Sequence, residues 1–100
     1  MALEILYTPQ FTDNLEAILS YFDIRNGSNT YSRELFQTVH ERIRLLITMS
    51  EIGRLTDFPG VRILFLESYG IEYQIRDTVI LIIDIFSCKT NPTKRRFRKK

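Results

Sequence analysis

Cationic and phenolic side chains gather in the second half of the chain, on or directly after segments that alternate like β-strands. They are Arg62, Tyr69, Tyr73, Arg76, Lys89 and Lys94. Such groups can bind a phosphate backbone and stack on bases, and with a suitable acid and base they can help a ribose 2′-OH attack its own phosphate. Tyr69 and Tyr73 also share a strand face with two isoleucines, so both tyrosines equally fit a role as core aromatics with hydroxyls at the rim.

Residue types that most enzyme classes need are scarce. Cys88 and His40 are the single cysteine and histidine, which excludes an intramolecular disulfide and a zinc site built from four Cys/His ligands. Glycine-rich phosphate loops, a nucleophile elbow and closely spaced catalytic carboxylates are missing too. We therefore expect no metal and no cofactor, and interpret His40 as a residue at the boundary of an apolar helix face.

The charges are unevenly distributed along the chain. Residues 1–88 carry seven Arg, no Lys and twelve Asp/Glu, a net charge of −5, whereas residues 89–100 carry seven Lys/Arg and no acid. A basic end on an acidic body is either a solvated tail or a contact for a polyanion. On the second interpretation, the candidate nucleic-acid contacts are Arg54, Arg76, Lys94, Arg95 and Arg96.

The N-terminal sequence lacks a charged segment followed by an apolar stretch, and no apolar run approaches the ~20 residues of a membrane helix. We expect a soluble, unprocessed, cytoplasmic protein. The length of 100 residues predicts one domain with a modest core, over residues 1–94, and a basic tail at residues 95–100.

The first half predicts a strand followed by a helical hairpin. Residues 1–7 form the strand, and Thr8 is a candidate N-cap for a helix that ends near Asn26-Gly27. A second helix is predicted from the polar residues 28–30 to about Ser50. Residues 51–60 break both periodicities and predict a loop that contains Arg54.

The second half predicts three consecutive strands over residues 61–66, 69–76 and 79–86. The last of them, VILIIDIF, is too apolar for a strand with one solvated face and is predicted to be the buried centre of the sheet. Asp84 interrupts it and needs a partner there, for which Arg62 is the nearest plausible cation. The predicted fold is α+β, a small twisted, mainly antiparallel sheet backed by the helix hairpin in the order β-α-α-β-β-β.

The order of these elements, the PGVR step at residues 59–62, the strand SYGIEYQI and the ending IDIFSCKTNPTK resemble the RelE/ParE superfamily. The superfamily comprises bacterial toxins of type II toxin–antitoxin modules, in places described as plasmid stabilisation proteins. The resemblance extends over residues 2–94 and implies a growth-inhibiting toxin that forms a hetero-oligomer with its cognate antitoxin protein.

Three functions are compatible with this resemblance. RelE-like members are mRNA interferases that cleave mRNA on the ribosome without a metal, using Arg, Lys and Tyr. ParE-like members lack those residues and act on DNA gyrase. A degenerate toxin would only bind its antitoxin. Ribosome-dependent RNA cleavage is the first candidate, with gyrase inhibition as the alternative.

When the catalytic residues of the superfamily are matched one at a time to this sequence, the resemblance implies Arg62, Tyr73 and Lys89. Tyr69 and Tyr73 fit a Tyr-Arg-x-x-Tyr pattern whose arginine is Gly70 in this chain, and the arginine before an Asn-Pro step corresponds to Lys89. Without the arginine at position 70 the site lacks a bidentate phosphate ligand, and a lysine ammonium does not replace that planar geometry.

Overall fold

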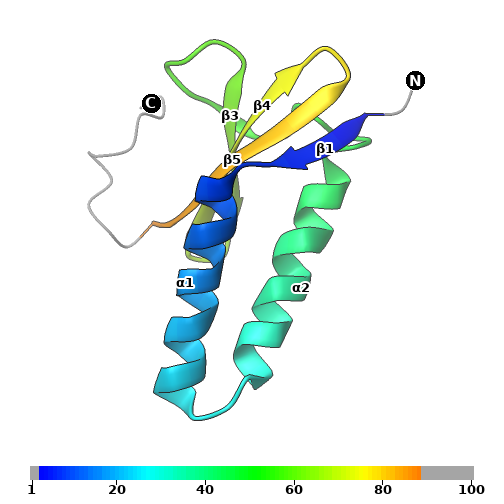
Figure 1. The fold of residues 1–100 in the computed structure, drawn as a ribbon. Helices are drawn as coiled ribbons and strands as arrows, with labels where there is room; N and C mark the ends of the chain where they lie inside the picture. Colours follow the sequence, from blue (N-terminus) through cyan, green and yellow to red (C-terminus); the bar gives the residue numbers. More distant parts are fainter. Residues whose placement is uncertain (1–2, 89–100) are drawn as a thin grey trace.

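The computed structural model describes residues 3–88 (Figure 1). Lys89, Lys94, Arg95, Arg96 and the predicted tail at residues 95–100 lie outside the described residues. Two helices run side by side on one side of a sheet, and the turn that joins them projects away from it. The predicted α+β fold with a helix hairpin is thus confirmed, with one more strand than expected.

Strand β1 (Glu4–Tyr7) leads directly into helix α1 (Pro9–Asn26). The Thr8 hydroxyl accepts a hydrogen bond from Phe11 N at 3.1 Å, and Pro9 occupies the first helical turn, where a missing N–H costs nothing. Gly27 ends the helix with a φ of +68°, in the left-handed region that glycine adopts readily. Both predicted ends of this helix are confirmed.

Helix α2 (Thr30–Leu45) is shorter than predicted. The backbone N–H groups of Leu46, Ile47 and Thr48 each bond a carbonyl three residues back, at 3.0–3.1 Å. This tighter, 3₁₀-type turn ends the helix about five residues before Ser50. An apolar side-chain pattern alone does not distinguish the last helical turn from such a turn.

The sheet contains five strands in the order β1-β5-β4-β3-β2. They are β2 (Arg54–Leu55), β3 (Val61–Leu66), β4 (Tyr69–Arg76) and β5 (Val79–Ser87), besides β1. β1 pairs with β5 in parallel and all other neighbours are antiparallel, so the predicted β3-β4-β5 meander is confirmed with β5 inside the sheet. The loop predicted for residues 51–60 is wrong at β2, where Arg54 pairs with Ile63.

The hydrophobic core lies between the helices and one face of the sheet. Phe11 and Leu15 of α1, with Val39 and Ile43 of α2, contact the inward-facing residues of β3, β4 and β5. The register of β4 and β5 shifts between Glu72 and Tyr73, which places a bulge in β5 close to Asp84.

Asp84 is paired, but the prediction that Arg62 is its partner is wrong. Its two carboxylate oxygens accept hydrogen bonds from Gln10 Nε2 at 2.9 Å and Asn14 Nδ2 at 2.6 Å, both on α1. One of these oxygens also accepts from Ile85 N at 2.8 Å. A buried carboxylate needs such donors. They come from the packed helix α1, whereas the prediction had considered only residues on neighbouring strands.

Candidate functional site

Tyr73 lies in the interior of the protein. Its side chain has 0% exposure, and its hydroxyl donates to Ser50 O at 2.8 Å and accepts from Gly53 N at 2.9 Å. A Cβ at position 53 would come within 2.5 Å of the Tyr73 hydroxyl oxygen, so glycine is needed there. Burial raises the pKa of the Tyr73 phenol, which holds the group in its neutral form.

Arg62 is the cross-strand partner of Tyr73 and contacts the same segment. Its Nη1 donates to Gly53 O at 2.8 Å and to Glu51 O at 3.0 Å. Together, Arg62 and Tyr73 form four hydrogen bonds to the backbone of residues 50–53, the connection between α2 and β2. We call this connection the 50–53 segment. The structure therefore brings two of the three predicted catalytic residues together, around backbone groups of the chain itself.

Gly70 is closely covered by an aromatic ring. It pairs with Phe86 across β4 and β5, and a Cβ at position 70 would lie 2.5 Å from Phe86 Cζ. The Phe86 side chain is 8% exposed, so neighbouring atoms restrict the movement that would make room for a larger residue. A larger side chain at this position of the sheet would therefore have to displace the Phe86 ring.

The other predicted contacts are dispersed. Arg54 is exposed on the two-residue strand β2 at one edge of the sheet. Arg76 is exposed at the end of β4, and its Nε donates to Gln74 Oε1 at 2.9 Å. Lys89, Lys94, Arg95 and Arg96 fall outside residues 3–88. Within the described part of the chain, no cationic cluster forms from the predicted nucleic-acid contacts.

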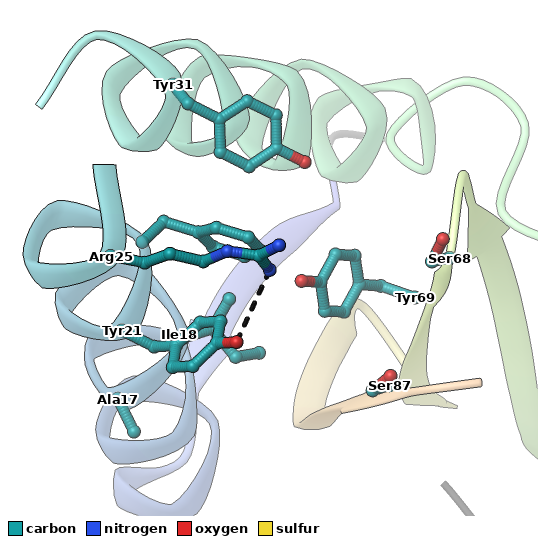
Figure 2. A pocket seen from close by; sticks show the side chains of 9 residues that line it. Ala17, Ile18, Tyr21, Arg25, Tyr31, Ser68, Tyr69 and Ser87 are labelled. Carbon is teal, nitrogen blue, oxygen red and sulfur yellow. Dashed lines mark hydrogen bonds between the residues drawn. The ribbon is translucent and has the colours of Figure 1, made fainter. Parts of the chain in front are cut away.

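A pocket of about 670 Å³ opens between the helices and the start of β4. Figure 2 shows Arg25, Tyr21, Tyr31 and Tyr69 with their polar ends pointing toward one another. Ala17, Ile18, Phe22, Ser68 and Ser87 complete the wall. Tyr69 was among the residues predicted from the sequence, whereas the helical residues were not. The signal that could have indicated them is the spacing of Tyr21 and Arg25, one helical turn apart.

Two further findings bear on function. Within residues 3–88, no group of three or more His, Cys, Asp or Glu side chains is arranged to hold a metal ion. Neither of the described helices is long and apolar enough to span a membrane.

Comparison with known proteins gives the family. The family model described as "ParE toxin of type II toxin-antitoxin system, parDE" matches residues 5–92. This chain belongs to the ParE toxin family. A solved structure titled "Chromosomal ParDE TA system from P. aeruginosa" has a similar fold, with a TM-score of 0.76 and 22% sequence identity over 87% of this chain and 97% of that one. Curated proteins give no sequence match.

ParE membership confirms the superfamily suggested by the sequence and locates the chain on one branch of it. The resemblance had pointed to Arg62, the tyrosines of β4 and Lys89 as cleavage residues, and Lys89 lies outside the described residues. In this ParE-family fold, Tyr73 and Arg62 bind the 50–53 segment, and Tyr69 lines the pocket between the helices and the sheet.

Proposed function

We propose that this ParE-family chain is the toxin of a type II toxin–antitoxin module and that it stops growth by binding DNA gyrase, without cleaving RNA. The burial of Tyr73 favours gyrase binding over RNA cleavage. Its hydroxyl donates a hydrogen bond to Ser50 O and accepts one from Gly53 N.

Metal-independent RNA cleavage needs a group that takes the 2′-OH proton and cations that face the phosphate. The Tyr73 phenol has no exposed surface, and its raised pKa disfavours the phenolate that would act as a base. Arg62 directs Nη1 to two backbone carbonyls. Gly70 supplies no side chain to the phosphate. Of the predicted cleavage residues that the structure describes, none is therefore free to act as the base, which disfavours RNA cleavage.

We also propose that an antitoxin covers part of the helical surface. Tyr7 of β1 contacts the ring of His40 with centroids 5.9 Å apart, and Phe36 contacts the same ring at 4.3 Å. Tyr7 and Phe36 are 43% and 46% exposed. An aromatic surface that continues from an edge strand onto a helix is typical of a protein interface, open to strand addition and to a docked helix.

The purified chain can be tested in two parallel assays. In a DNA gyrase supercoiling reaction we expect inhibition at a near-stoichiometric ratio of chain to gyrase. In the second assay, mRNA 5′ ends are mapped on translating ribosomes, and we expect the same ends with and without the chain. Full supercoiling at high excess of the chain would overturn the gyrase mechanism. New mRNA ends that disappear in an Arg62→Ala, Lys89→Ala double variant would replace it by RNA cleavage.

A further inference from the structure

The pocket between the helices and the sheet is lined by hydrogen-bond donors around one cation. Arg25 and Tyr21 come from α1, Tyr31 comes from the first turn of α2, and Tyr69 begins β4 (Figure 2). Arg25 Nη1 lies 3.4 Å from the Tyr21 hydroxyl, one helical turn away on the same helix. Among the described residues, none of the side chains that line the pocket carries a negative charge.

Tyr69 gives the pocket an unused polar group. Its side chain is only 7% exposed, its hydroxyl points into the pocket toward Arg25, and no hydrogen bond to that hydroxyl occurs among residues 3–88. Among the described residues no buried side-chain polar atom lacks a partner, so this hydroxyl reaches solvent in the open pocket and is available to donate to a ligand. A ligand that accepts hydrogen bonds can take the place of solvent at this hydroxyl.

We propose that this pocket binds the carboxylate of an acidic side chain flanked by apolar residues, in a peptide segment of the antitoxin. This inference rests on the proposed toxin–antitoxin function and specifies its interface. Arg25 binds the carboxylate, Tyr69 and Tyr31 donate hydrogen bonds to it, and the flanking residues contact the apolar wall formed by Ala17, Ile18 and Phe22.

The charge of the pocket favours a carboxylate over a phosphate group. A single guanidinium matches a single negative charge and can bind both carboxylate oxygens. Burial is the main cause that raises the pKa of the Tyr69 phenol, followed by Tyr31 and by the charge of Glu67, which lies in the β3–β4 turn. The same negative charge would oppose a phosphate dianion more strongly than a carboxylate. The volume of about 670 Å³ accommodates the flanking apolar side chains as well.

The test is an NMR titration of the whole chain with two blocked tripeptides, Leu-Glu-Phe and Leu-Gln-Phe, which have the same shape and differ in charge. We expect the acidic peptide to bind about tenfold more tightly, as one charge-assisted pair provides. The amide shifts should concentrate at Arg25, Ser68, Tyr69 and Ser87. Equal affinity for the two peptides, or shifts located elsewhere, would overturn the proposal.

Variants assign the effect to the pocket. Arg25→Gln should abolish the preference for the acidic peptide, and Tyr69→Phe should weaken its binding about fivefold, through one lost hydrogen bond. Arg44→Gln removes an exposed arginine of α2 that does not line the pocket, so its peptide binding should equal that of the unchanged chain. An unaltered preference in Arg25→Gln contradicts the proposal.

Inorganic phosphate is the competing probe. Tighter binding of phosphate than of the acidic peptide would assign the pocket to phosphate ligands and overturn the carboxylate proposal. The titration uses neither gyrase nor living cells, so its failure leaves the supercoiling result untouched. Conversely, a chain that does not inhibit gyrase can still show the peptide preference, and the two proposals fail separately.

Discussion

The ring of Phe86 occupies the space into which a side chain at Gly70 would extend, with only 2.5 Å between Phe86 Cζ and a Cβ at position 70. The two residues are directly opposite on β4 and β5. An aromatic ring that covers a glycine on the adjacent strand compensates for the packing that glycine lacks. We therefore expect the pair to stabilise the sheet, and a larger side chain at position 70 has to displace the ring.

A double-mutant cycle tests this packing. Gly70→Ala should lower the free energy of unfolding by about 1–3 kcal/mol, because the added methyl displaces the Phe86 ring. Phe86→Ala should cost about 3–5 kcal/mol. We expect the double variant to be more stable than the two separate losses predict, by at least ~1 kcal/mol in urea unfolding. Additive losses would show that the ring does not restrict position 70.

Tyr73→Phe tests whether the hydroxyl is structural. The change leaves the ring in place but removes a buried hydroxyl with two hydrogen bonds to the 50–53 segment. We expect a loss of about 1–3 kcal/mol in the free energy of unfolding. Tyr21→Phe, at a side chain 55% exposed, is the control and should change stability by less than ~0.5 kcal/mol. An unchanged stability in Tyr73→Phe would contradict the role of this hydroxyl.

Alkaline pH provides an independent readout of Tyr73. Burial raises the pKa of its phenol in the folded chain above the value near 10 of an unfolded tyrosine. The unfolded state therefore releases this proton first, so the contribution to stability is complete below pH ~10 and is lost as pH rises through the folded pKa. Urea midpoints between pH 8 and 11 should fall less steeply in Tyr73→Phe. The same slope in both chains would exclude this titration.

The sequence predicted those parts of the fold that depend on local patterns. The Thr8 cap, the Gly27 end of α1 and the alternation of Tyr69, Ile71 and Tyr73 on one strand face are each visible within a few residues. The strand meander follows from the same alternation. What these features share is that neighbouring residues in the chain determine them.

Features that depend on packing between distant elements were not predictable in this way. Asp84 receives its donors from α1, some 70 residues earlier, so strand arguments could only suggest Arg62. The Arg62 guanidinium and the Tyr73 hydroxyl bind backbone carbonyls, and residue types carry no information about those acceptors. The pocket residues Arg25 and Tyr69 meet only after the helix hairpin folds over the sheet.

The amides that bind Asp84 make a further prediction. Asn14→Ala removes a hydrogen bond of 2.6 Å to a carboxylate that is only 2% exposed. Because a buried carboxylate loses a donor, we expect a loss of about 1–3 kcal/mol in the free energy of unfolding. Asp13→Ala, on the exposed side of the same helix, is the matched control and should stay within ~0.5 kcal/mol of the unchanged chain. Because alanine favours a helix more than either residue does, helix propensity cannot cause a loss, and equal losses in both variants would contradict a specific role of the Asn14 amide.

Substitutions of Arg62 distinguish a structural role of this residue from a catalytic one. Arg62→Ala removes two hydrogen bonds to the carbonyls of Glu51 and Gly53, and we expect a loss of about 1–2 kcal/mol in stability. Arg62→Lys keeps a positive donor that reaches one of these carbonyls, so its loss should be about half as large. At a temperature where both variants are folded, each should inhibit gyrase supercoiling as the unchanged chain does. If both variants instead kept full stability and lost growth inhibition, Arg62 would be acting on a target and not on the 50–53 segment.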